Sequence, residues 1–149
     1  MQLKTLFAGL ITLTIIGAPT LVRADEPGRH PSYLHARTDL RTAQMLMRVD
    51  DPDPRVMRNL REAAENVEAA IHEIDRASVI DGKNLEDHPR VDAIPDRAGR
   101  LHRIRELLRQ GRADLGREED DSRARGWRNA AYGHIDEAVE HINRLIDGR

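Results

Sequence analysis

The chain has 149 residues, of which 34% are charged and only 3% are aromatic, and it contains no cysteine. That length fits one domain, and the absence of a thiol excludes disulfides, cysteine nucleophiles, CxxC redox pairs and c-type haem attachment. The 24 basic and 26 acidic side chains nearly balance, for a formal net charge of −2, so no overall field attracts nucleic acid or an anionic membrane.

Residues 1–24 have the pattern of a secretory signal peptide. Lys4 precedes an apolar run from Leu6 to Ile16, and a small-residue cleavage site ends at Ala24. The run is shorter than the roughly 18 to 20 residues that a bilayer span needs, which favours cleavage over an uncleaved anchor. We therefore expect a mature domain of residues 25–149 that is periplasmic or secreted and has no membrane span, since a cysteine-free exported chain suits a bacterial periplasm.

Four later segments carry apolar residues at helical spacing, and none shows a sustained strand-like alternation. The expected helices are about residues 31–49, 54–80, 96–117 and 122–147. Asp53-Pro54 is typical of a helix start, whereas Asp81-Gly82 and Asp147-Gly148 are typical of helix ends. A longer link, residues 81–95, joins the second helix to the third.

An internal repeat relates the two halves of the chain, because a shift of 68 residues superimposes them without gaps. The shift carries Leu40 onto Leu108 and Ala70 onto Ala138, and the acidic run at Asp50 onto that at Glu118. The sequence therefore predicts an all-α fold, an up-down-up-down four-helix bundle made of two duplicated helical hairpins.

In that topology both hairpin turns lie at the same end of the bundle and gather seven carboxylates there. These are Asp50, Asp51, Asp53, Glu118, Glu119, Asp120 and Asp121. Such a cluster could bind a hard divalent cation through oxygen ligands. We favour helix capping and neutralisation by nearby arginines, because neither run has the spacing or the turn glycine of an EF-hand.

The same topology places six of the seven histidines toward the opposite end, which holds the 81–95 link and both termini. The six are His30, His35, His72, His88, His102 and His141. Imidazoles beside carboxylates suit Zn or Cu. Against a metal site, these histidines do not follow the internal repeat, no HExxH or ExxH motif occurs, and His72, His102 and His141 fall off the apolar stripes.

Four arginines do follow the repeat, since Arg37 and Arg41 fall on Arg105 and Arg109. They could clamp an anionic ligand, but interhelical ion pairs with neighbouring acids are the simpler interpretation. Catalysis has little support, because no nucleophile elbow, SxxK context or glycine-rich phosphate loop is present. We therefore expect that the protein is not an enzyme.

Three segments resemble an uncharacterised family of secreted bacterial helical-bundle proteins, and that family implies no activity. They are His30-Pro31-Ser32-Tyr33-Leu34-His35-Ala36, Asp81-Gly82-Lys83-Asn84-Leu85-Glu86-Asp87-His88-Pro89, and Glu118-Glu119-Asp120 followed by Ala124-Arg125-Gly126. More faintly, residues 131–145 are similar to a repeat of small histidine-rich periplasmic metal-binding proteins, which carry histidine at far higher density.

Two functions follow from these features. The first is a periplasmic, non-enzymatic binding or interaction module whose partner is another periplasmic protein. The alternative is a bundle that binds a divalent transition metal, Zn or Cu, through His30, His35, His88 and His102, with His72 and His141 in support. An enzyme working through carboxylates ranks behind both.

Overall fold

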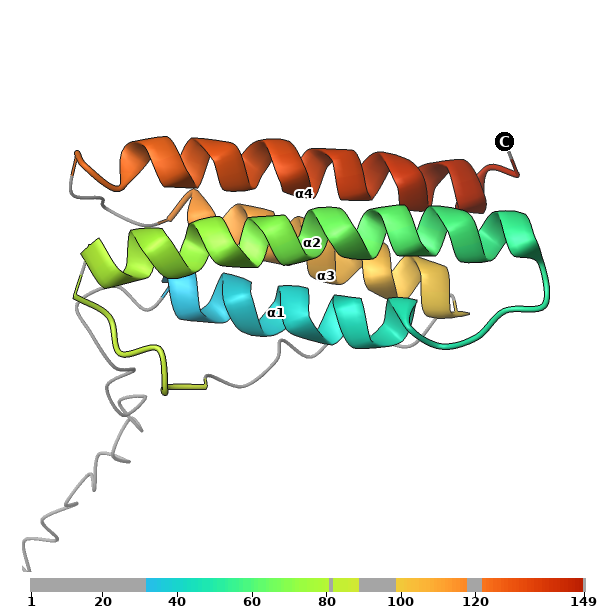
Figure 1. Cartoon of the computed structure of the whole chain (residues 1–149), viewed down its shortest axis with the longest axis horizontal. Coiled ribbons are helices and arrows are strands. Elements are labelled where there is room, and N and C mark those ends of the chain that lie inside the picture. Colours follow the sequence, from blue (N-terminus) through green and yellow to red (C-terminus); the bar gives the residue numbers. More distant parts are fainter. Residues whose placement is uncertain (1–31, 81, 89–98, 118–121, 149) are drawn as a thin grey trace, which may run out of the picture.

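The computed structural model describes residues 32–80, 82–88, 99–117 and 122–148 (Figure 1). Within them the chain forms four α-helices and no strand, which confirms the predicted all-helical bundle. The helices are α1 (Ser32–Met47), α2 (Pro54–Ile80), α3 (Gly99–Leu115) and α4 (Arg125–Ile146). The expected signal peptide, residues 1–24, lies outside the described residues, and no helix within them is long and apolar enough to cross a membrane.

The helix starts follow local chemistry at two places. Asp53 caps α2, because the backbone N–H of Arg55 donates to its Oδ1 at 2.8 Å. Gly99 opens α3 with φ at +75°, a left-handed conformation that glycine adopts without a steric penalty. The third helix therefore begins three residues later than the sequence predicts.

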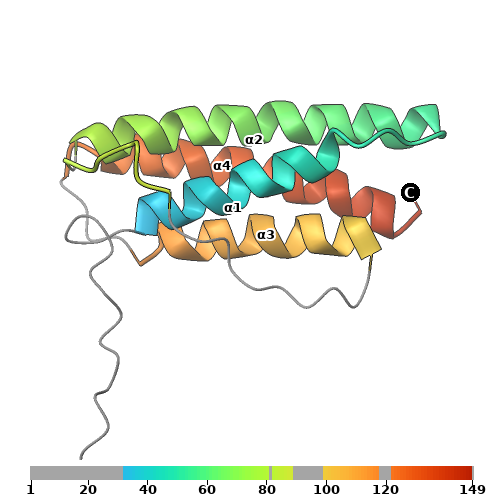
Figure 2. The same ribbon diagram turned by 90° about the horizontal axis from the view of Figure 1, so that it is seen from below.

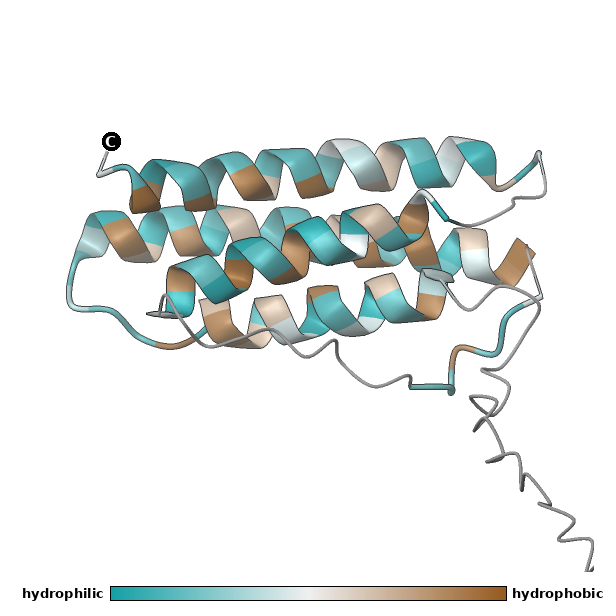
Figure 3. Cartoon of the chain, turned by 180° about the vertical axis from the view of Figure 1, so that it is seen from behind, coloured by the Kyte–Doolittle hydropathy of each residue, from teal (hydrophilic) through white to brown (hydrophobic). Residues whose placement is uncertain are grey.

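Each helix buries one apolar stripe, and Figure 3 shows apolar and polar residues alternating around every helix. Leucine, isoleucine, valine and alanine make up most of this core, and Tyr33 is the one aromatic side chain fully buried among the described residues. The largest fully buried aliphatic side chains are Leu34, Leu40, Leu60, Val67, Ile74, Ile104, Leu107, Leu108, Leu115, Ile135 and Ile142. Each such side chain contributes about 1.5–3 kcal/mol of transfer free energy.

Every helix packs against two others. Helix α1 lies against α2 and α3, and α4 lies against the same two helices, so α1 is diagonal to α4 and α2 is diagonal to α3 (Figures 1 and 2). The four helices thus surround a single core, and each helix is antiparallel to the two helices that it packs against. Consecutive helices are neighbours in only two of three cases, since α2 does not pack against α3.

The direction of α3 corrects the predicted topology. Arg100, next to the start of α3, donates from Nη1 to the Val49 carbonyl and from Nη2 to Asp51 Oδ2, each at 2.9 Å. The start of α3 therefore lies beside the α1–α2 turn, and α3 runs in the same direction as α2, as Figure 2 shows. The order is up-down-down-up, and the up-down-up-down prediction is wrong.

The length of the connection permits this topology. Between Ile80 and Gly99 lie 18 residues, which can reach about 60 Å when extended. The 17 residues of α3 measure only about 26 Å along the helix axis. The connection is therefore long enough to return along the whole bundle as a crossover, as in other four-helix bundles that lack a simple alternation.

This order separates the two acidic runs. The turn with Asp50, Asp51 and Asp53 lies at one end, whereas the end of α3 and the start of α4 lie at the other (Figure 1). The predicted pole of seven carboxylates is therefore wrong. Its other members, Glu118, Glu119, Asp120 and Asp121, lie outside the described residues.

Candidate functional site

The histidines do not gather at one end of the bundle. His35, His72 and His88 lie toward the end where α1 begins and α2 stops, whereas His102 lies two residues beyond Arg100 at the opposite end. His141 also lies toward that opposite end, because its Nδ1 is 3.2 Å from Glu62 Oε2 in the first part of α2. The predicted histidine pole is wrong for these two residues, since it assumed the other directions of α3 and α4.

The described residues contain no group of three or more His, Asp or Glu side chains that could hold a metal ion. His30 lies outside the described part of the chain. His72 Nε2 lies 3.5 Å from Glu68 Oε1 on the surface of α2, which is an ordinary i, i+4 pair. His72 and His141 thus take part in separate contacts on different parts of the bundle.

Arg37 forms a cross-link inside the bundle. Its side chain is 8% exposed and its Nε lies 2.7 Å from Asp75 Oδ1. Its Nη1 donates to the Leu85 carbonyl at 2.6 Å. This guanidinium therefore ties α1 to the end of α2 and to the link that follows. Interhelical pairing, the simpler of the two interpretations of the repeated arginines, is what the structure shows at this position.

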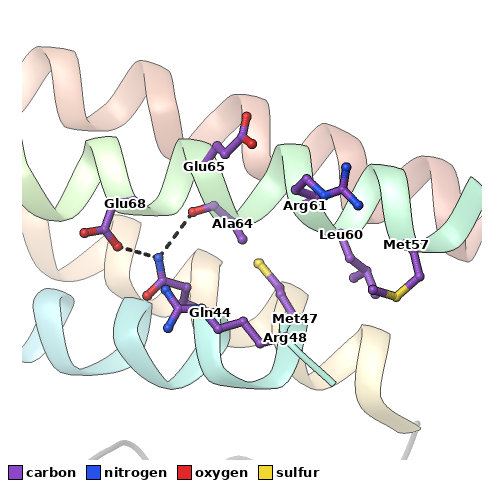
Figure 4. Close-up of a pocket in the computed structure, with 9 residues that line it drawn as sticks. All are labelled: Gln44, Met47, Arg48, Met57, Leu60, Arg61, Ala64, Glu65 and Glu68. Atoms are coloured by element: carbon purple, nitrogen blue, oxygen red, sulfur yellow. Dashed lines mark hydrogen bonds between the residues drawn. The ribbon is translucent and has the colours of Figure 1, made fainter. Parts of the chain in front are cut away.

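A candidate site is a pocket of about 450 Å³ between the second half of α1 and the first half of α2 (Figure 4). We call it the α1–α2 groove. It is lined by Gln44, Met47, Arg48, Met57, Leu60, Arg61, Ala64, Glu65 and Glu68. Its size falls in the usual range for small-molecule sites, about 300–1,000 Å³.

The floor of the groove is apolar. Met47 and Leu60 are buried, and Met57 and Ala64 are partly buried, so four apolar side chains line the space between the helices. Figure 4 shows Met47 rising from α1 and Leu60 descending from α2 toward it. Two of the four are methionines, whose flexible thioethers adapt to ligands of irregular shape.

Hydrogen bonds fix both ends of the groove. At one end Gln44 Nε2 donates to Glu68 Oε2 at 2.6 Å and to the Ala64 carbonyl at 3.3 Å, which joins α1 to α2 (Figure 4). At the other end the backbone N–H of Asp51 donates to Met57 Sδ at 3.2 Å. These contacts position Gln44, Glu68 and Met57, which line the groove.

Larger side chains pair at the corresponding positions of α3 and α4. A shift of 68 residues carries Ala64 onto Tyr132, and the pair Gln44 and Glu68 onto Arg112 and Asp136. Arg112 donates to Asp136 from Nε at 2.6 Å and from Nη2 at 3.0 Å, and its guanidinium lies 4.9 Å from the centroid of the Tyr132 ring. The hydrogen bond to Asp136 raises the pKa of Arg112. Ala64 thus leaves the seam between α1 and α2 open, whereas Tyr132 and Arg112 cover the seam between α3 and α4.

A second, shallower hollow of about 400 Å³ lies where α2 ends, beside Val79, Leu85 and Trp127. The Arg76 guanidinium lies 4.8 Å from the centroid of the Trp127 ring, so a cation already covers one ring face. This hollow is therefore less suited to stacking a ligand than the α1–α2 groove is to enclosing one.

Sequence reasoning missed the α1–α2 groove. The repeat already aligned Ala64 with Tyr132, a large difference in side-chain volume, but the periodicity does not tell which partly buried positions meet across a helix pair. Comparison of the chain with protein-family models, with curated proteins and with solved structures finds no match to any of them.

Proposed function

We propose that the protein is an exported, non-enzymatic binding module whose ligand occupies the α1–α2 groove. The observation that carries this proposal is the groove itself, a space of about 450 Å³ with an apolar floor. The apolar lining of such an open hollow stays in contact with water until a ligand covers it, so an apolar ligand gains free energy by leaving water there.

The proposal includes a duplicated origin for the two hairpins. It is supported by core positions that are buried in both members of each pair 68 residues apart. Leu40 and Leu108, Val67 and Ile135, and Ile74 and Ile142 are such pairs. On this view the hairpins share a core, and only the first keeps its outer seam open for a ligand.

Export rests on the leader pattern of residues 1–24, with its apolar run and its small-residue site at Ala24. A periplasmic or secreted protein would meet its ligand outside the cytoplasm. The described helices carry no constellation of nucleophile and base that would suggest a reaction, so the groove is proposed to bind rather than to convert.

A titration with a neutral, environment-sensitive naphthylamine fluorophore tests this function. The unmodified protein should give saturable fluorescence enhancement, because the groove removes the probe from water. Ala64→Tyr should abolish the enhancement, because it places in the groove the ring that Tyr132 places in the other hairpin. Ala130→Tyr is the matched control, since Ala130 is an exposed position of α4 outside the groove.

Two outcomes would contradict the proposal. The fluorophore could fail to bind the folded protein, or Ala64→Tyr could bind it as tightly as the unmodified chain does. Circular dichroism of both tyrosine variants establishes that the bundle is intact. Ala64 is only partly buried and lines the groove, so a larger side chain at this position faces the groove rather than the core.

A further inference from the structure

Resting on the proposed function, we propose that the ligand of the α1–α2 groove is an amphiphilic monoanion, an apolar chain that ends in a carboxylate. The apolar body would lie on Met47, Met57, Leu60 and Ala64. The carboxylate would pair with Arg48 at the edge of the groove. This chemistry follows from which charged groups around the groove are already engaged and which are not.

Arg48 is the available cation on the α1 side of the groove. Its guanidinium makes no ion pair or hydrogen bond with any described residue, although the backbone N–H of Arg48 donates to the Gln44 carbonyl. Figure 4 shows its side chain lying along α1 toward Gln44, below the opening between the two helices. A guanidinium in this position offers a planar fork to a carboxylate.

The acids of the groove are less available. Glu68 accepts the Gln44 amide at 2.6 Å through Oε2 and lies 3.5 Å from His72 through Oε1. Arg61 and Glu65 also line the groove from α2 and carry opposite charges, and Figure 4 shows Glu65 extending away from α1. The charge that faces an incoming ligand from α1 is therefore positive, and it stands beside an apolar floor, which is the arrangement that an amphiphilic anion complements.

The ligand class also fits the shape of the site. The groove is open along one side and closed by hydrogen bonds at its two ends, so it suits an elongated body with a polar group at the rim. The polarizable thioethers of Met47 and Met57 can contact an apolar chain along this site.

Competition among three ligands with the same chain and different head groups tests the inference. Dodecanoate, dodecanol and dodecyltrimethylammonium are each titrated against the protein loaded with the naphthylamine fluorophore, at concentrations below those at which they aggregate. Dodecanoate should displace it at about a tenfold lower concentration than dodecanol, as expected for one charge-assisted hydrogen bond, and the cation should be the weakest competitor.

Arg48→Gln should remove this preference and leave dodecanol unaffected. Arg58→Gln is the matched control, because Arg58 is an exposed arginine of α2 that does not line the groove. The control should keep the full preference for dodecanoate.

The outcomes separate the inference from the proposed function. Equal displacement by all three ligands, or an unchanged preference in Arg48→Gln, would overturn the anionic ligand while fluorophore binding to the groove stood. Displacement that Ala64→Tyr does not alter would overturn both. Tightest binding of the ammonium ligand would assign the opposite charge to the ligand and would also overturn the inference.

Discussion

The α1–α2 and α3–α4 hairpins bury similar aliphatic residues in the core but carry different residues at the seam where their helices meet the solvent. In the first, Ala64 leaves a groove that Gln44 and Glu68 close at one end. In the second, Tyr132 and Arg112 cover the seam and Asp136 holds the arginine in place. Buried positions therefore determine the fold of the bundle, whereas a few partly buried positions determine whether it has room for a ligand.

The largest predicted effect concerns the shared core. Leu40 and Leu108 are both fully buried and lie 68 residues apart, so Leu40→Ala and Leu108→Ala should each lower the free energy of unfolding by about 3 kcal/mol. Urea denaturation followed by circular dichroism measures both. A cost that is large at one position and below about 1 kcal/mol at the other would show that the two hairpins do not share equivalent cores.

A smaller effect should distinguish two arginines of the repeat. Arg37→Met removes the partner of Asp75 and the donor to the Leu85 carbonyl, so it should cost about 2 kcal/mol. Arg105→Met should cost less than about 0.5 kcal/mol, because Arg105 forms no ion pair with any described residue and position 143 holds asparagine where position 75 holds aspartate. The same denaturation experiment compares them. Equal costs would show that the Arg37 cross-link does not stabilise the bundle.

A loss of stability smaller than those of Leu40→Ala and Arg37→Met should come with a new binding site. Tyr132→Ala removes a partly buried ring and its contact with Arg112, so it should cost about 1 kcal/mol and open the α3–α4 seam. Fluorophore titration should then show a second site. Tyr132→Phe retains the ring and should retain a single site, and a second site in that variant would show that the ring does not close the seam.

Helix content and the identity of the core could be predicted from the sequence, because amphipathic periodicity is a local property. The stripe with Leu60, Val67 and Ile74 lies in α2 as expected. Helix direction could not be predicted in the same way. A link of 18 residues between Ile80 and Gly99 permits either a return turn or a crossover, and nothing local in its sequence distinguishes them.

The placement of histidines and acids failed for the same reason. The predicted location of His102 and His141, at the end with the 81–95 link, is wrong because their helices run opposite to the predicted direction. The helix start predicted at Asp53-Pro54 is confirmed, because capping by Asp53 depends only on neighbouring residues. The groove could not be predicted from the sequence, because it depends on how Met47 and Leu60 meet across two helices. Periodicity along the chain carries no information about such contacts.

NMR of the protein with carbon-13 labels on its methionine methyl groups tests most directly whether a ligand binds in the α1–α2 groove. Met47 and Met57 line the groove, whereas Met45 lies on α1 outside it and is 64% exposed. On addition of the fluorophore or dodecanoate, the signals of Met47 and Met57 should shift and that of Met45 should stay in place. Shifts confined to Met45, or none at a ligand concentration that saturates the fluorescence signal, would contradict a ligand site in the α1–α2 groove.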